Sequence, residues 1–307
     1  MDYVLRTFDI SKKYHSNQVL NKVNMNIARG DIYGFVGENG SGKTTIIRLI
    51  TGLISPNEGY VELFGIPSTS PEITKARRKV GAIVESPSIY RNMSAKDNLL
   101  MQSTILGIND EEKIKRTLAD VGLFELYNNS KKANNFSLGM RQRLGIAMAL
   151  LGDPEFIILD EPMNGLDPAG IVEIRELILK LNRERNITFL ISSHILNELA
   201  LVATKYGIIS HGTLLKEISS EELEHECRPS IIIETSNPEA LWALLSNKIP
   251  SEDLSHLVNG VRIIGNLNLN ALLKDVLDNG IEILSINCQK TNIENYYLSV
   301  IGGNHHA

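Results

Sequence analysis

The sequence predicts an α/β fold in two domains, and three observations support that prediction. Over residues 1–220, short β-rich apolar runs alternate with helix-compatible segments, as in parallel sheets whose strands are buried on both faces. From residue 228 onward the pattern is weaker and of a different kind. The chain has 307 residues, of which 43% are hydrophobic and 22% charged, so it is long enough for two domains with buried cores.

The first domain is expected to begin with a β-rich part. Residues 3–14 and 18–27 alternate between apolar and polar side chains, as strands do. Residues 32–37 are apolar or small throughout, which predicts a buried strand. The segment 46–53 has apolar residues at helical spacing, and we expect that helix to end near Pro56.

Three later apolar runs predict further strands: residues 80–85, 156–161 and 187–193. Between the first two of them, residues from about 88 to 150 contain almost no β-rich run and are compatible with helices. We therefore expect a mostly helical subdomain inserted in the α/β core of a domain that spans residues 1–220.

The second domain is expected at residues 228–307, after a boundary near 219–230. Its predicted order of elements is β, α, β, β, α, β, with a hairpin turn signalled by Asn259-Gly260. This order is typical of a small α+β domain of the ferredoxin-like kind. A last helix over about 293–303 is expected to pack back.

Composition excludes several classes of protein. The net charge of −5 argues against a broad grip on nucleic acid, so no nucleic-acid partner is expected. The apolar stretches are far shorter than the roughly 18 to 20 residues of a membrane-spanning helix. The first residues carry charges where a signal peptide needs an apolar block, and the two cysteines offer no disulfide framework. The expected location is the cytoplasm.

The strongest signal in the chain is a phosphate loop between a predicted strand and a predicted helix. The full motif is Gly37, Glu38, Asn39, Gly40, Ser41, Gly42, Lys43 and Thr44. Its glycines let the backbone bend until successive N–H groups point at an anion. A turn that merely connects strand and helix is the alternative, but the complete spacing favours the core of a P-loop NTPase.

Three residues at the end of this loop have separate expected roles. Lys43 supplies a positive charge for the β and γ phosphates of a nucleotide, and Thr44 a hydroxyl ligand for Mg²⁺. Thr45 is expected to contact the α phosphate. A nucleoside triphosphate with Mg²⁺ is thus the expected ligand, and the family resemblance described below implies that it is ATP.

A pair of carboxylates ends the predicted strand 156–161. Asp160 is expected to hold the Mg²⁺, and Glu161 to orient and deprotonate the attacking water. Such a pair alone often does no more than solvate the end of a strand. Downstream of a phosphate loop, it predicts a hydrolytic site.

A third motif, Phe136–Arg143, lies ahead of these carboxylates, and with it the chain resembles the nucleotide-binding subunit of ATP-binding cassette (ABC) transporters. The resemblance covers residues 1 to about 220 in order, and includes Asp167 in the D-loop and His194 as the switch histidine. The signature residues of the third motif are Ser137, Leu138, Gly139 and Met140.

Helix physics supports this signature, because Ser137 is a good N-cap for the predicted helix after it. Arg141 and Arg143 put positive charge in the first turns of that helix, where the helix dipole prefers acids, and this favours phosphate binding. The alternative is that both arginines are solvated or paired with acids.

The resemblance implies an assembly and a binding mode. In the family, the signature of one subunit caps the γ phosphate held by the phosphate loop of another, so we expect a homodimer or a paired cassette subunit. An integral membrane permease is the further implied partner, with this chain peripheral on the inner face of the cell membrane. Tyr14 is expected to stack on adenine, although it is equally of a type that packs at strand edges.

One departure narrows the resemblance. Glu85 stands where most of the family has glutamine, and it is expected to ligate the metal or position water, although an ionised carboxylate donates no hydrogen bond. Together with residues 90–99 and the C-terminal extension, it resembles the subgroup that protects bacteria against bacitracin and lantibiotics. We hypothesise that Glu85 couples nucleotide state to the helical subdomain.

The sequence therefore predicts an ATP-hydrolysing subunit that powers a separate membrane permease, which exports or removes peptide antibiotics. A cassette ATPase that acts on ribosomes or DNA is the alternative, and a phosphate-loop kinase is a third possibility.

Overall fold

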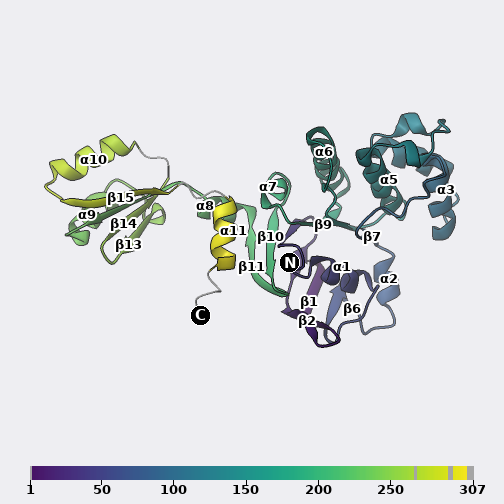
Figure 1. Ribbon diagram of the computed structural model, residues 1–307, viewed down its shortest axis with the longest axis horizontal. Helices are drawn as coiled ribbons and strands as arrows, with labels where there is room; N and C mark the ends of the chain where they lie inside the picture. Colours follow the sequence, from purple (N-terminus) through teal and green to yellow (C-terminus); the bar gives the residue numbers. More distant parts are fainter. Residues whose placement is uncertain (1, 266–267, 290–292, 303–307) are drawn as a thin grey trace. The chain divides into compact units, whose positions relative to one another are not determined.

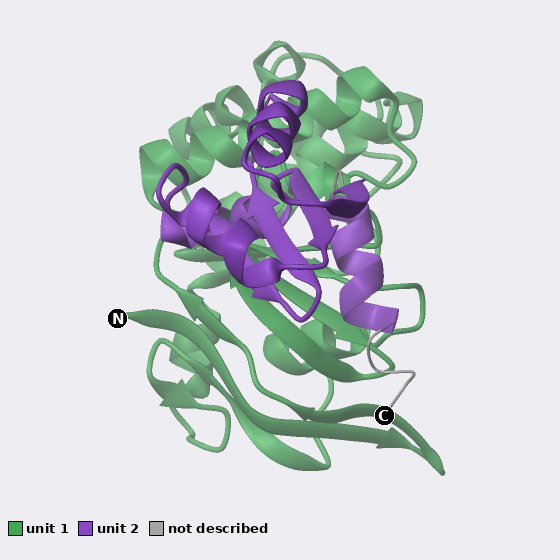
Figure 2. Cartoon of the chain, turned by 90° about the vertical axis from the view of Figure 1, so that its left-hand side faces the viewer, with its two compact units in different colours: residues 1–220 green, residues 221–307 purple. Residues whose placement is uncertain are grey.

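The computed structural model describes residues 2–265, 268–289 and 293–302. It divides into two compact units, Met1–Ser220 and Glu221–Ala307, and this division lies within the expected boundary region 219–230 (Figures 1 and 2). No helix in the described ranges is long and apolar enough to cross a membrane.

Unit 1 opens with an antiparallel sheet. Its strands are β1 (Tyr3–Tyr14), β2 (Asn17–Val23), β3 (Asn26–Ala28), β5 (Glu58–Leu63) and β6 (Ile66–Pro67). The strand order is β2-β1-β5-β6, with β3 also paired to β1. This is the β-rich N-terminal part that alternation of side chains predicted.

The alternating run 18–27 forms two strands, β2 and β3, and the chain breaks between them. Asn24 lies at the break, and its side chain accepts a hydrogen bond from the Asp9 backbone N–H and donates one to the Asp9 carboxylate, both at 2.9 Å. Asp9 itself has a φ of 47°, so β1 is irregular at the same point. The Asp9 N–H is thus bonded to a side chain in place of a ladder carbonyl.

A second, mostly parallel sheet forms the centre of unit 1, in the order β11-β10-β4-β9-β8-β7. Its strands are β4 (Ile32–Val36), β7 (Val80–Ile83), β8 (Phe156–Asp160), β9 (Thr188–Ser193), β10 (Lys205–Ser210) and β11 (Thr213–Ser219), of which only β11 runs antiparallel to its neighbour. Every residue of β4, β8 and β9 is buried, which explains why their sequences are mostly apolar. The carboxyl ends of these three strands meet at one edge of the sheet.

Three helices accompany this sheet: α1 (Lys43–Thr51), α6 (Pro168–Arg185) and α7 (Leu196–Leu199), whereas α2 (Ile73–Arg77) packs against β5 and β6 of the antiparallel sheet. The apolar face of α1 packs into the core through Ile46, Ile47 and Ile50. The expectation that α1 ends near Pro56 is wrong. Gly52 ends it earlier by adopting a left-handed C-cap with φ 79°, which costs a glycine little.

The inserted segment is helical. Its helices are α3 (Ala95–Leu106), α4 (Glu111–Asp120), α5 (Leu138–Leu150) and the short 3₁₀ turns Phe124–Leu126 and Ala133–Asn135. Figure 1 shows α3 and α5 side by side. A capping box starts α3, in which the Ser94 hydroxyl accepts from the Asp97 N–H at 3.1 Å and donates to the Asp97 carboxylate at 2.8 Å. The predicted α/β class with a helical part is confirmed.

Unit 2 contains a four-stranded antiparallel sheet in the order β13-β14-β12-β15. Its elements are α8 (Ser220–Glu226), β12 (Ser230–Thr235), α9 (Pro238–Ser246), a 3₁₀ turn (Ser251–Asp253), β13 (Leu254–Leu257), β14 (Gly260–Ile264), α10 (Leu269–Asp278), β15 (Ile283–Gln289) and α11 (Ile293–Gly302). Side chains of α9 and α10 share one core with β12 and β14. This is the ferredoxin-like order. Val258 and Asn259 form the hairpin turn and Gly260 already begins β14, so the turn lies one residue before the expected Asn259-Gly260.

The capping box of α3 predicts a pH-dependent contribution to stability. Ser94→Ala is expected to lower the free energy of unfolding by about 1 kcal/mol at neutral pH. Hydrogen bonds from the Ser94 hydroxyl and backbone N–H lower the pKa of Asp97. Because that pKa is lowered on folding, the stabilisation is present above the ordinary pKa of aspartate and is lost as the pH falls through the lowered value.

Urea unfolding at a series of pH values measures this difference. Thr104→Ala, an exposed change on the same helix, is the matched control. The capping account fails if Ser94→Ala and Thr104→Ala unfold alike at neutral pH.

Candidate functional site

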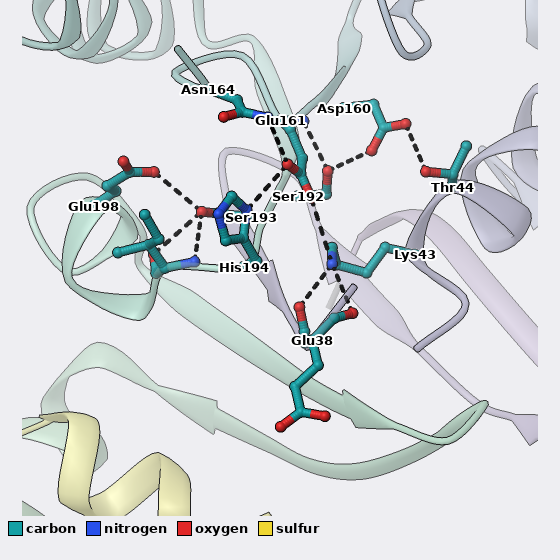
Figure 3. Close-up of polar contacts among 12 residues, drawn as sticks. Glu38, Lys43, Thr44, Asp160, Glu161, Asn164, Ser192, Ser193, His194 and Glu198 are labelled. Carbon is teal, nitrogen blue, oxygen red and sulfur yellow. Dashed lines mark hydrogen bonds and ion pairs between the residues drawn. The ribbon is translucent and has the colours of Figure 1, made fainter. Parts of the chain in front are cut away.

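The predicted site residues converge where β4, β8 and β9 end. The phosphate loop follows β4, Asp160 is the last residue of β8, and His194 follows β9. Figure 3 shows Lys43, Thr44, Asp160, Glu161 and His194 linked by polar contacts at this edge. The parallel strands thus bring together groups that are more than 100 residues apart in the chain.

Lys43 is held inside the loop that precedes it. Its ammonium group donates to the carbonyl oxygens of Gly37 at 2.7 Å and Glu38 at 3.1 Å. It also lies 3.5 Å from the Glu161 carboxylate, and its side chain is only 5% exposed. The Lys43 ammonium group is therefore buried and fixed in position, where it can bind the negatively charged oxygen atoms of a ligand.

The backbone of the loop is shaped for close approach. Gly40 and Gly42 have φ values of 83° and 110°, which favour glycine. At Gly37 a Cβ atom would lie 2.5 Å from both the Ile209 carbonyl oxygen and the Ser41 hydroxyl, so no larger residue fits.

The hydrogen bonding of the Ser41 hydroxyl indicates whether a phosphate group fits the loop. It is buried and, among the described residues, has no hydrogen-bond partner. Buried polar atoms in proteins are almost always paired, so an orphaned hydroxyl in the loop fits an oxygen-rich ligand such as a phosphate group.

Thr44, Asp160 and Ser192 form a hydrogen-bonded chain across three elements. The Thr44 hydroxyl donates to Asp160 Oδ2 at 2.9 Å, and the Ser192 hydroxyl donates to Asp160 Oδ1 at 2.6 Å. Asp160 is only 3% exposed. The sequence analysis gave Ser192 no role of its own, because a serine within an apolar strand carries no distinctive pattern.

This donor set fits Mg²⁺. A hydroxyl and a carboxylate are hard oxygen ligands, and Mg²⁺ in nucleotide sites takes few protein ligands and completes its shell with phosphate oxygens and water. The described part of the chain holds no cluster of three or more His, Cys, Asp or Glu side chains that would form an all-protein metal cage. Thr44 and Asp160 are therefore the candidate metal ligands.

Glu161 lies beside Asp160 but points elsewhere. Its φ of 47° turns the backbone, and its N–H donates to the Ser192 hydroxyl at 2.9 Å. His194 Nδ1 lies 3.0 Å from Glu161 Oε2, and the Asn164 amide donates to the same oxygen at 3.3 Å. Asn164 is the first residue of the segment 164–167, which resembles the D-loop of the family, and no role in the site was expected for it.

Two cavities adjoin these groups. One, of about 220 Å³, is lined by Val19, Asn39, Gly40, Gly42, Lys43, Thr44, Thr45 and Glu161. The other, of about 300 Å³, is lined by Thr44, Glu85, Ser86, Pro87, Leu138, Gln142, Asp160, Glu161 and Asn164. Val19 was missed because nothing in the sequence distinguishes it from other strand residues.

Glu85 lines the larger cavity with Thr44 and Asp160, but its carboxylate is engaged elsewhere. It pairs with the guanidinium of Arg48 on α1. Its expected role as a metal ligand stays a prediction.

The signature residues lie at the start of α5. The Ser137 hydroxyl caps this helix by accepting from the Met140 N–H at 3.1 Å, and Leu138 is 41% exposed. Gly139 follows in the first turn.

The two arginines near the start of α5, Arg141 and Arg143, make polar contacts within the chain. Arg141 donates to the Phe136 carbonyl oxygen at 2.5 Å, and Arg143 pairs with Glu173 at 3.4 Å. These contacts favour the alternative that the arginines are structural.

Two residues that were expected in the site, Asp167 and Tyr14, lie outside the network of polar contacts around Asp160 and Glu161. Asp167 caps α6 by accepting from the Gly170 N–H at 3.1 Å. Tyr14 ends β1 with 40% of its surface exposed, and the Lys12 ammonium lies 5.3 Å from its ring centre. Its exposed ring remains available for stacking.

Comparison with known proteins adds independent findings. Residues 20–164 match the family model described as ABC transporter. The "Bacitracin transport ATP-binding protein BcrA" of Bacillus licheniformis is 41% identical over 305 residues, which are 99% of this chain and 99% of that protein. The "Lantibiotic transport ATP-binding protein SrtF" of Streptococcus pyogenes is 41% identical over 234 residues, 75% of this chain and 99% of its own length.

Solved structures agree on the fold. The structure of cbiO1 from Clostridium perfringens, part of the ABC transporter complex cbiONQ, has a TM-score of 0.66 at 27% identity, covering 74% of this chain and 92% of that one. A dimeric post-hydrolysis structure of the ATP-binding cassette MJ0796, bound to ADP and Pi, has a TM-score of 0.62 at 26% identity, covering 70% of this chain and 98% of its own.

The chain of contacts through Ser192 predicts a stability effect. Ser192→Ala leaves Asp160 Oδ1 and the Glu161 N–H without their partner at a position where Ser192 is 0% exposed. We expect a loss of about 1 to 3 kcal/mol in the free energy of unfolding, measured in urea. The exposed Ser88→Ala is the control, and equal stability of the two variants would contradict the structural role of Ser192.

Proposed function

The chain belongs to the ATP-binding subunits of ABC transporters and is an ATPase, and from that premise we propose that it powers a separate membrane permease that removes peptide antibiotics. The observation that carries the proposal is the convergence of Lys43, Thr44 and Asp160 at one sheet edge, with Glu161 next to them.

Nucleotide binding uses the loop and its first helical turn. Lys43 and the N–H groups of the loop hold the phosphates, and the buried Ser41 hydroxyl gains an oxygen partner. Thr44 and Asp160 hold Mg²⁺. When bound, this ion neutralises phosphate charge and stabilises the leaving group. Tyr14 stacks on the adenine ring.

Hydrolysis uses Glu161. Its carboxylate accepts a proton from the attacking water, while His194 and Asn164 hold Oε2 at 3.0 and 3.3 Å and so fix the direction of the group. The turned backbone at Glu161 separates this carboxylate from that of Asp160, so one residue serves the metal and the next serves the water.

Two copies complete each site in this proposal. Ser137 and Gly139 of one copy meet the γ phosphate held by the other, with Leu138 and Met140 beside them and Asp167 at the shared interface. The exposed Leu138 supports this arrangement, because its side chain is open to a second molecule. ATP then closes the pair, and hydrolysis reopens it.

The transported substrate is proposed from the relatives. Two of them are named for bacitracin transport and lantibiotic transport, and the first aligns with this chain over nearly its whole length. We propose a peptide antibiotic of this class as the cargo and the inner face of the cell membrane as the place of action.

Glu161→Gln tests the assignment of the base. Glutamine keeps the shape but accepts no proton, so turnover is expected to fall at least about a hundredfold while ATP still binds and holds the dimer. Phosphate release and size-exclusion chromatography with ATP measure the two effects. Normal hydrolysis in Glu161→Gln removes Glu161 from the role. Glu184→Gln, an exposed change near the C-terminal end of α6, is the matched control.

Antibiotic sensitivity tests the cargo. A sensitive bacterium that expresses the chain with its permease is expected to tolerate more bacitracin or lantibiotic, and Lys43→Ala is expected to abolish that gain. Minimal inhibitory concentrations for a panel of both peptide classes measure it. Equal resistance with Lys43→Ala contradicts an ATP-driven mechanism, and no gain for any peptide contradicts the proposed cargo.

A further inference from the structure

The larger cavity of the site contains an excess of negative charge. Three carboxylates line it, from Glu85, Asp160 and Glu161. Lys43 is already engaged by two carbonyl oxygens and by Glu161. A triphosphate that enters brings further negative charge, which Lys43 and a metal ion at Thr44 and Asp160 would offset. The carboxylate of Glu85 adds to that charge and needs a cation of its own.

We propose that Arg48 is a positioning residue that holds the Glu85 carboxylate and offsets its charge, and thereby makes the cavity compatible with nucleotide binding. This inference rests on the proposed function, because it takes the phosphates to bind on the loop before α1.

The helix places Arg48 where this role requires it. Thr44 and Arg48 are four residues apart on α1, so they lie on the same face of the helix one turn apart. Thr44 contacts Asp160, and Arg48 contacts Glu85. One helix face therefore engages two of the three carboxylates.

The backbone at Glu85 is consistent with a held side chain. Its φ of 63° lies in the left-handed region, which costs a non-glycine residue of order 1 kcal/mol or more and persists only where neighbouring contacts impose it. The Ser86 N–H donates to the Val84 carbonyl oxygen at 2.8 Å and closes a tight turn around Glu85. Val84 in turn packs against the core of unit 1.

The role concerns ligand binding more than folding. The side chains of Arg48 and Glu85 are 39% and 59% exposed, and exposed ion pairs contribute little to stability. In the described part of the chain, Arg48 is the one basic side chain that pairs with Glu85. Without it, the Glu85 charge acts on the phosphates uncompensated.

Equilibrium binding of ATP to the full chain tests the proposal, with and without Mg²⁺. The variants are Arg48→Gln, Glu85→Gln and the double change. Arg48→Gln is expected to weaken binding of Mg²⁺-free ATP about fivefold. Binding of the complex of ATP with Mg²⁺ is expected to weaken less, because that complex carries less negative charge. In the Glu85→Gln background, Arg48→Gln is expected to change affinity little, and the loss in the single variant is expected to shrink at high salt.

Controls separate the possible causes. Arg48→Lys keeps the charge and is expected to retain most of the affinity. Arg228→Gln, an exposed pair member in unit 2, is the matched charge control and is expected to bind like wild type. Thermal unfolding of each variant identifies any that fail to fold.

The outcomes are distinguishable. An equal loss of ATP affinity from Arg48→Gln in both backgrounds overturns the inference, because Arg48 then acts without Glu85. Unchanged affinity in the single variant Arg48→Gln also overturns it. If wild-type chain itself binds no ATP, the proposed function fails instead.

Discussion

The hydrogen bond between the Thr44 hydroxyl and Asp160, at 2.9 Å, is the contact on which the rest of the site depends. It joins the first turn of α1 to the end of β8, and Ser192 from β9 fixes the second carboxylate oxygen. Because all of this lies in the buried edge of the sheet, each polar group needs its partner, and the geometry of one fixes the others. The position of a metal held by Thr44 and Asp160 would therefore be set by α1, β8 and β9.

A single turn of the backbone places the adjacent carboxylates of Asp160 and Glu161 in different surroundings. Asp160 ends a regular strand and is almost fully buried, whereas Glu161 has a left-handed φ of 47° and faces Lys43 and His194. The turn of the backbone between Asp160 and Glu161 therefore separates the candidate metal ligand from the proposed proton acceptor. His194 reaches Glu161 only because β9 lies next to β8 in the sheet. The central sheet thus positions the chemistry, while the helical segment brings Leu138 and Gln142 to the neighbouring cavity.

The sequence predicted what depends on local pattern. The phosphate loop and the strands around it were recognisable because glycine spacing and buried apolar runs are contiguous, and the ferredoxin-like order of unit 2 followed from alternating element types. Contacts across the sheet were not recognisable. Ser192 acts on Asp160 only because β9 lies between β4 and β8, and the Arg48–Glu85 pair joins residues 37 apart. The break after β2 was missed because it depends on Asn24 and Asp9 meeting across two strands.

A crystal structure of the full chain with Mg²⁺ and a non-hydrolysable ATP analogue would show where the metal and the nucleotide bind. We expect the metal at about 2.1 Å from the Thr44 hydroxyl, with Asp160 bonded to it directly or through water and Lys43 against the β and γ phosphates. A nucleotide bound elsewhere, or a metal that contacts neither Thr44 nor Asp160, would contradict this expectation.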